Sequence, residues 1–148
     1  MRAVLLGIGL VVASAANSAL AQPREVRAQI AEDRKDCRDT GYPARTRKGY
    51  VRSADFNGDG KPDYILDNEK LDCGTVKCGS AGCTITIFVS AGQGYRLSFD
   101  DNVRSWKIVR RGKRDVIDAN IHGSYCGRAG SYDCRKTISW NGLTMSAQ

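Results

Sequence analysis

From Gly49 onward, apolar and polar side chains alternate with a period of two, in short runs separated by glycine-containing turns. The clearest run is residues 84–89, in which Ile85, Ile87 and Val89 share one face. Comparable runs are 50–54, 64–66, 95–99, 103–110, 116–121 and 137–140, and Asn141-Gly142 is a hairpin dipeptide that lets 143–145 pair back. The pattern predicts about seven short antiparallel strands.

Ahead of the strands, residues 23–37 have a helical pattern. Val26, Ile30 and Cys37 fall on one narrow stripe of the helix, and nearly all other positions are polar or charged. Gly41 follows and ends the helix. Because a short, polar helix is marginal alone, we expect a surface helix that a disulfide of Cys37 ties to the domain.

The first 21 residues differ from the rest of the chain. Arg2 precedes an apolar run over residues 3–13, and a small-residue cleavage site ends at Ala21, as in a secretory signal peptide. The alternative is a membrane anchor, but polar side chains interrupt the apolar stretch. We expect cleavage after Ala21, so that the mature chain begins at Gln22 and has no transmembrane span.

The mature chain, residues 22–148, has the length of one domain. Six cysteines, an even number in a small exported chain, predict disulfide bonds rather than a zinc site, because no C-x-x-C pair is present. Several pairings stay open, and proximity favours three: Cys78–Cys83, Cys126–Cys134 and, as the remainder, Cys37–Cys73. The fold class is therefore mainly β: a single small antiparallel-sheet domain with one short N-terminal helix, stapled by disulfides.

An acidic loop, residues 55–63, joins two of the predicted strands. Five residues could supply oxygen ligands, the fourth through its backbone carbonyl: Asp55, Asn57, Asp59, Lys61 and Asp63. Calcium prefers hard oxygen ligands from a tightly wound loop, and Gly60 permits the sharp turn. Carboxylates so close together repel one another without a cation. The sequence predicts calcium as a cofactor, and the alternative is a polar loop of simple turns.

This segment resembles the calcium loop of FG-GAP and VCBS-type repeats, whose pattern is D-x-[DN]-x-D-G-x-x-D between two strands. The match covers the nine residues 55–63. In those families the loop joins adjacent strands of a propeller blade, and the ninth-position Asp, here Asp63, closes the site. The chain is far too short for a propeller and has no second copy, so the resemblance implies the calcium site alone. An EF-hand is disfavoured, since Leu66 stands where its bidentate Glu belongs.

The formal charge is +7, and loss of Arg2 with the signal peptide leaves +6. Four cations gather at the tip of one predicted hairpin: Arg110, Arg111, Lys113 and Arg114. Such a tip could bind an anionic polymer, a lipid head group or another envelope protein. No nucleic-acid-binding module is recognisable. The alternative is a solvated turn that protects a sheet edge.

His122 is the chain's one histidine, with Ser124 and Asp118 near it in sequence. No nucleophile signature surrounds it, so we assign no catalytic residue and expect a protein that is not an enzyme. The function predicted is an exported, calcium-stabilised binding or structural module of the bacterial envelope or exterior, periplasmic or secreted. The alternative is an envelope enzyme or an enzyme inhibitor that acts through His122 and the Cys126–Cys134 loop.

Overall fold

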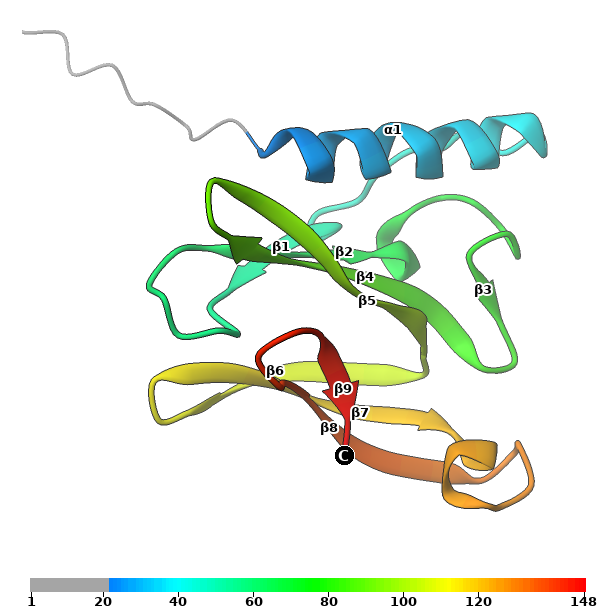
Figure 1. Ribbon diagram of the computed structural model, residues 1–148. Coiled ribbons are helices and arrows are strands. Elements are labelled where there is room, and N and C mark those ends of the chain that lie inside the picture. Colours follow the sequence, from blue (N-terminus) through cyan, green and yellow to red (C-terminus); the bar gives the residue numbers. More distant parts are fainter. Residues whose placement is uncertain (1–21) are drawn as a thin grey trace, which may run out of the picture.

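A computed structural model describes residues 22–148, and the predicted signal peptide, residues 1–21, lies outside this range. The described chain folds into one α-helix, two short 3-10 helices and nine strands. The helix lies over one sheet, and a second sheet packs against the opposite face of the first (Figure 1). The predicted mainly-β class with one N-terminal helix is confirmed. No helix among residues 22–148 has the length and apolar character needed to cross a membrane.

The first sheet contains the strands β1 (Val51–Ala54), β2 (Asp63–Asp67), β3 (Cys78–Gly79), β4 (Gly82–Ala91) and β5 (Gly94–Val103). Its long strand β4 pairs antiparallel with β2, β3 and β5, while β1 pairs with β2. A bulge interrupts the β4–β5 register between Ile87 and Phe88. Along β4 the predicted alternation holds, because Ile85, Ile87 and Val89 are all fully buried on the face toward the second sheet.

The second sheet runs in chain order through β6 (Ser105–Arg111), β7 (Arg114–His122), β8 (Asp133–Trp140) and β9 (Met145–Ala147). The strand predicted over 103–110 is confirmed from Ser105 onward, but its predicted start is two residues too early, because Val103 is the last residue of β5. Between β5 and β6 the chain leaves one sheet for the other, and the Arg104 N–H donates to the carbonyl of Asn120 at 2.8 Å.

The last hairpin also begins later than predicted. The Asn141 side-chain oxygen accepts the N–H groups of both Leu143 and Thr144 at 2.9 Å. These two residues therefore belong to the turn, and pairing with β8 starts only at Met145. A side chain that satisfies local backbone donors in this way competes with the ladder of the sheet.

The main core lies between the two sheets. It contains Phe56, Ile65, Ile85, Ile87, Val89, Val103, Ile117, Ala119, Ile121, Cys134, Ile138 and Met145. Trp106 and Trp140 pack against this core and are partly buried, and the Arg52 guanidinium lies 4.5 Å from the centre of the Trp106 ring. Both tryptophans thus contribute to packing between the layers.

A smaller core lies between the first sheet and the helix α1 (Arg24–Asp39), which is two residues longer at its end than the predicted 23–37. Two residues of the predicted stripe, Val26 and Cys37, are fully buried in it, and Ile30 packs at its margin. The sheet contributes Leu66 and Phe88 to the same core. Strand β2 therefore buries apolar side chains on both faces.

The charged helix also buries Asp33, which the sequence pattern gave no reason to expect. Asp33 is 0% exposed, and its carboxylate accepts a hydrogen bond from the Tyr50 hydroxyl at 3.0 Å and pairs with Lys77 Nζ at 2.9 Å. Burial and the neighbouring carboxylate raise the pKa of Tyr50, so its hydroxyl stays a donor. This cluster fixes the helix to the first sheet by polar contacts as well as by the apolar stripe.

All three disulfide pairings favoured by the sequence are present: Cys37–Cys73, Cys78–Cys83 and Cys126–Cys134. The first closes a separation of 36 residues and joins the helix to the segment after β2. In the chain-entropy description, a loop of this size contributes about 4 kcal/mol by restricting the unfolded chain. The helix that was expected to need a tether has one.

Asp67 closes β2 and is 4% exposed. Its Oδ1 accepts the Glu69 N–H at 3.1 Å and so caps the 3-10 helix η1 (Asn68–Lys70). Burial raises the pKa of Asp67 and outweighs this hydrogen bond, so the folded chain holds the proton more tightly than the unfolded chain does. Ionisation of Asp67 at neutral pH therefore costs stability, and the cost disappears once both states are protonated.

We expect Asp67→Asn to raise the free energy of unfolding at pH 7, because the amide oxygen keeps the cap and the buried charge is gone. The gain should shrink as the pH falls through the raised pKa of Asp67 in the folded chain, and it should be gone below about 3.9, the usual pKa of an unfolded Asp. Urea unfolding at pH 7 and at about pH 3 measures this change in the free energy of unfolding. The exposed substitution Asp72→Asn is the control. A loss of stability at pH 7 would show that the charge of Asp67 is needed.

Candidate functional site

The acidic loop, residues 55–63, connects β1 and β2, as the sequence predicted. Phe56 is fully buried in the main core and anchors the loop to the space between the two sheets. Gly58 and Gly60 have φ values of +77° and +80°, in the left-handed region. Glycine enters that region without a steric cost, so both residues let the backbone wind tightly.

The loop is closed by its own backbone. Four N–H groups donate to three of its side chains over 2.7–3.1 Å: Gly58 and Gly60 to Asp55, Asp59 to Asn57, and Lys61 to Asp59. Each accepting oxygen is left with a further lone pair. The arrangement turns side-chain oxygens inward on the loop, and the partial charges of the N–H groups offset the repulsion between the carboxylates.

Ser90, near the end of β4, ties this loop to the first sheet. Its hydroxyl donates to Asp59 Oδ2 at 2.7 Å, and the Asn57 amide donates to its backbone carbonyl at 3.0 Å. Desolvation acts to raise the pKa of Asp59, but the hydrogen bonds from Ser90 and the Lys61 N–H outweigh it and lower that pKa. Asp59 is consequently an exposed carboxylate that is ionised at neutral pH.

Asp63 has a different environment from the other predicted ligands. It is 0% exposed, and its two oxygens accept the backbone N–H groups of Phe56 at 2.7 Å and Ser90 at 2.8 Å. Burial raises the pKa of Asp63 in spite of these two bonds. Its carboxylate joins the start of the loop to β4. Lys61 points its ammonium away from the loop, with Nζ 3.4 Å from the carbonyl of Gly92.

The donor chemistry of the loop suits calcium, because every available side-chain ligand is an oxygen and Asp59 is ionised. Within residues 22–148, however, no three His, Cys, Asp or Glu side chains lie close enough together to hold a metal ion. Asp63, the fourth predicted side-chain ligand, is engaged by backbone donors. The calcium site stays a prediction that rests on Asp55, Asn57 and Asp59.

The tip of the β6–β7 hairpin docks on the acidic loop. The Asp55 N–H donates to Asp115 Oδ2 at 2.8 Å, and the Asp115 N–H donates to the Asp55 carbonyl at 2.7 Å. Arg114 lies against Gly58, where even a Cβ would stand only 3.0 Å from the arginine side chain. The acidic loop connects two strands of the first sheet, and its hydrogen bonds to Asp115 attach the second sheet to the first.

All four cations predicted at this hairpin tip are exposed, and two of them are paired. Arg110 pairs with Asp115 at 3.2 Å, and Arg111 pairs with Asp118 at 3.2 Å. Lys113 and Arg114 form no ion pair with any residue of the described chain. The tip therefore keeps a surplus of positive charge, although half of the predicted group also has a structural role.

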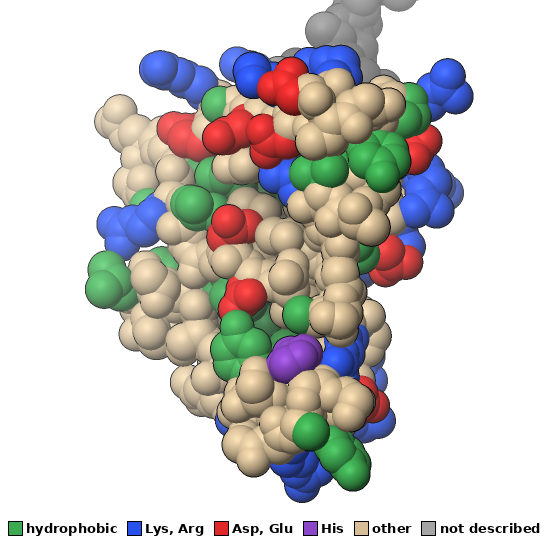
Figure 2. Space-filling view, turned by 90° about the vertical axis from the view of Figure 1, so that its right-hand side faces the viewer, with side chains coloured by type: hydrophobic (Ala, Val, Ile, Leu, Met, Phe, Trp, Pro, Cys, Tyr) green, Lys and Arg blue, Asp and Glu red, His purple; other side chains and the backbone are tan. Residues whose placement is uncertain are grey.

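His122 forms a local contact. Its Nδ1 lies 2.8 Å from Ser124 Oγ and caps the 3-10 helix η2 (Gly123–Cys126), while Gly130 packs against the ring. Figure 2 shows the imidazole, in purple, at the surface below acidic side chains. Asp118 is not its partner, because it pairs with Arg111 and Thr137. The structure brings His122 and Ser124 together, and no carboxylate among residues 22–148 is hydrogen-bonded to the ring.

Arg104, at the crossing between the sheets, holds the Cys126–Cys134 loop in place. Its guanidinium donates to the carbonyls of Gly130 and Tyr132, the latter at 2.9 Å, and on its other side to the carbonyl of Ser80 at 3.3 Å. One side chain therefore links this loop, the β3–β4 turn and the sheet crossing. This role of Arg104 could not be predicted from the sequence, because the acceptors of its hydrogen bonds are backbone carbonyls of two distant loops.

A second region that the sequence did not single out is the outward face of the second sheet. Residues of β6, β7 and β8 line a shallow groove there of about 550 Å³. Its cations come from separate strands, so they form no cluster along the chain. Only the register of the three strands brings them together.

Comparison of the chain with protein-family models, with curated proteins and with solved structures gave no match.

We expect Arg104→Lys to increase the mobility of the Cys126–Cys134 loop. The ammonium group of lysine cannot hydrogen-bond to this loop and to the β3–β4 turn at the same time, as the guanidinium does. Amide hydrogen exchange of residues 127–132 should speed up roughly tenfold, the loss of about one charge-assisted hydrogen bond. Arg128→Lys, an exposed change within the loop, is the matched control. Equal exchange in both variants would show that the disulfide alone orders the loop.

Proposed function

We propose that this chain is an exported binding or structural module of the bacterial envelope or exterior, stabilised by calcium, with an anionic partner. The observation that carries the proposal is the junction between the acidic loop and the basic hairpin. Two hydrogen bonds of 2.7 and 2.8 Å join Asp55 to Asp115. Asp115 follows Arg114 in the chain and pairs with Arg110 across the hairpin, so it is next to two cations of the tip. The predicted cation site and the predicted anion-binding surface are thus one continuous structure.

Calcium would act on this junction from the acidic loop. Asp55, Asn57 and Asp59 would supply side-chain oxygens and Lys61 its backbone carbonyl, while Asp63 continues to hold the loop against β4. A bound divalent cation neutralises carboxylates that otherwise depend on N–H donors and one hydroxyl. Because the unfolded chain lacks the wound loop, binding stabilises the folded chain by mass action. The hairpin tip is fixed to the same loop and becomes more ordered with it.

An exported location is supported by two features. The signal-peptide pattern of residues 1–21 directs secretion, and three disulfides are typical of oxidising compartments. Calcium is plentiful outside the cell, where sites with a Kd of about 10⁻⁴–10⁻³ M are useful. An anionic partner is supported by the net charge of +6 after removal of Arg2 and by the exposed cations of the tip.

The calcium prediction is tested by thermal unfolding of the oxidised chain, residues 22–148, with calcium and with chelator. For a Kd of about 10⁻⁴ M, calcium at about 10 mM should add about 2.7 kcal/mol to the free energy of unfolding. Asp59→Asn keeps the acceptor for the Lys61 N–H but removes the charge, and it should abolish the response. The control Glu32→Gln removes one negative charge from an exposed position of α1, as Asp59→Asn does from the loop, and it should leave the response to calcium unchanged.

Identical melting curves with calcium and chelator, and no heat of calcium binding, would remove calcium from the proposal. The loop would then be a purely hydrogen-bonded junction between the sheets.

The anionic partner is tested with heparin as a generic polyanion. Replacing Arg110, Arg111, Lys113 and Arg114 by Gln should lower the salt concentration of elution more than replacing Arg24, Arg27, Arg38 and Lys48, which are also exposed. The reason is that clustered cations act together on one polymer, whereas dispersed ones do not. Equal shifts for the two variants would mean that overall charge, and no particular surface, attracts polyanions.

A further inference from the structure

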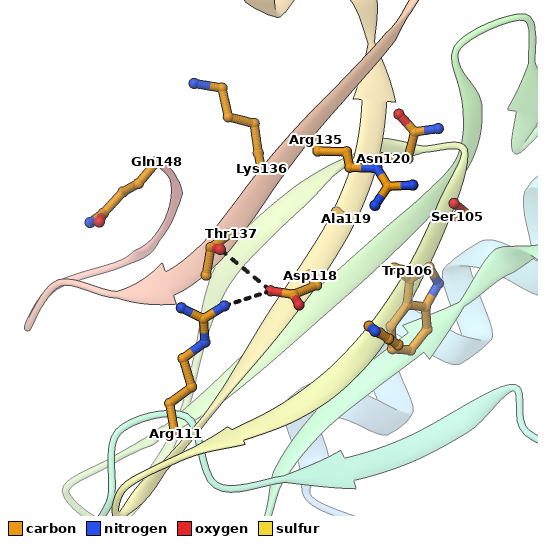
Figure 3. A pocket seen from close by; sticks show the side chains of 11 residues that line it. Ser105, Trp106, Arg111, Asp118, Ala119, Asn120, Arg135, Lys136, Thr137 and Gln148 are labelled. Carbon is orange, nitrogen blue, oxygen red and sulfur yellow. Dashed lines mark hydrogen bonds and ion pairs between the residues drawn. The ribbon is translucent and has the colours of Figure 1, made fainter.

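The groove on the outward face of the second sheet is open to solvent and polar. Figure 3 shows it with side chains of β6, β7 and β8 around it. Its lining consists of Ser105, Trp106, Lys107, Arg111, Asp118, Ala119, Asn120, Arg135, Lys136, Thr137 and Gln148. At about 550 Å³ it falls within the range of about 300–1,000 Å³ that is usual for small-ligand sites.

Positive charge dominates this groove. Four of its residues are cationic, and the single carboxylate, Asp118, is paired with Arg111 at 3.2 Å. Lys107, Arg135 and Lys136 form no ion pair with any residue of the described chain. Lys107 and Arg135 pair with Asp118 and Asn120 and share their outward face, whereas Lys136 pairs with the buried Ala119 and belongs to the opposite face. Two uncompensated cations on one open face favour a negatively charged ligand.

Asp118 nevertheless stands in the middle of these cations. In the register of the sheet it lies between Lys107 on β6 and Thr137 on β8. Both of its hydrogen-bonding neighbours, Arg111 and Thr137, contact the same oxygen, Oδ1 (Figure 3). Its other oxygen has no partner among the described residues, so it can accept from a ligand that carries hydroxyl groups.

The groove lacks a free aromatic face. Trp106 is its one aromatic side chain, and the Arg52 guanidinium lies 4.5 Å from the centre of that ring. The same ring packs against the core between the sheets. Stacking of a nucleobase on an aromatic platform, the usual means of holding single-stranded nucleic acid, has no place to occur here. Recognition must therefore come from charge and hydrogen bonds.

We propose that this groove binds an acidic polysaccharide, a chain of hydroxyl-rich sugars that carry carboxylates. The unpaired cations would take the sugar carboxylates, and the free oxygen of Asp118 would take sugar hydroxyls, helped by the neutral polar groups of Asn120 and Thr137. A DNA backbone offers phosphates but no hydroxyl donors along its length, so Asp118 repels it. This inference rests on the proposed anionic partner and names its chemical class and its place on the fold.

The test is calorimetric titration of the oxidised chain with polygalacturonate and, separately, with duplex DNA of equal total charge. The double variant Lys107→Gln/Arg135→Gln should bind polygalacturonate about tenfold more weakly or worse, since each lost charge-assisted contact accounts for roughly that factor. Arg24→Gln/Arg38→Gln removes the same charge from the exposed face of α1 and should bind as the parent chain does. Lys107 and Arg135 are exposed, so their replacement leaves the core intact.

Asp118→Ala gives a second readout that net charge alone would not produce. Removing a carboxylate makes the surface more positive, so it should tighten DNA binding. The same change removes the acceptor for sugar hydroxyls, so the ratio of polygalacturonate affinity to DNA affinity should fall severalfold. A ratio that stays constant would overturn the selectivity for sugars and would identify a general polyanion surface.

Equal polygalacturonate affinity in the groove variant and in its α1 control would overturn the groove as the site. If the four-residue hairpin-tip variant then lost binding, the proposed function would stand without this inference. If the parent chain bound no polyanion at all, both would fail, whereas the calcium response would still be decided by its own measurement.

Discussion

Strands β2 and β4 bury apolar side chains on both faces of the first sheet, and the other layers depend on that constraint. Ile65, Ile85 and Ile87 require cover on one face, and Leu66 and Phe88 require it on the other. Exposing either set would forfeit about 25 cal/mol per Å² of apolar area. The second sheet covers the first face, and the helix covers the second (Figure 1). A chain of this size can satisfy both requirements only with small cores, so additional links between the layers contribute much of the stability.

Those links are of different kinds in the two halves of the molecule. The helix is attached by the Cys37–Cys73 disulfide and by the buried Asp33, whose partners come from outside the helix as well as within it. Desolvation acts to lower the pKa of Lys77, but its bonds to Asp33 and Asp36 outweigh it and raise that pKa, so the ammonium stays charged. The second sheet is attached by the Arg104 crossing and by the acidic loop. Each attachment joins segments that are far apart in the sequence.

The acidic loop has a structural role in the fold and is also the proposed calcium site. Its inner carboxylate, Asp63, is used by the fold, whereas Asp55 is half-buried and Asp59 is exposed. The backbone of Asp55 contacts the basic hairpin through Asp115. The acidic loop and the basic hairpin tip therefore meet at the Asp55–Asp115 contact, and the surplus of positive charge continues onto the outward face of the second sheet. The proposed functions follow from that arrangement: a cation on the loop would order the tip, and the cationic face beyond it is free for a partner.

The elements that could be predicted from the sequence are those whose signals are local. Alternation identified the core strands, because a side-chain period of two places every second residue on one face. Proximity along the chain gave the disulfides Cys78–Cys83 and Cys126–Cys134, and elimination gave the third. The nine-residue loop was correctly predicted between its two strands, with a sharp turn at Gly60, whose φ is +80°.

Features that depend on pairing between distant segments became visible only in the folded chain. The fold assigned Val103 to β5 and started β6 only at Ser105, after the crossing between the sheets. It made Asp63 a buried acceptor for the N–H groups of Phe56 and Ser90. It also gathered Lys107 and Arg135 into one groove through the register of β6, β7 and β8. The physical reason is common to these cases: hydrogen bonds between strands set which side chains meet, and residues so joined have no fixed spacing along the chain.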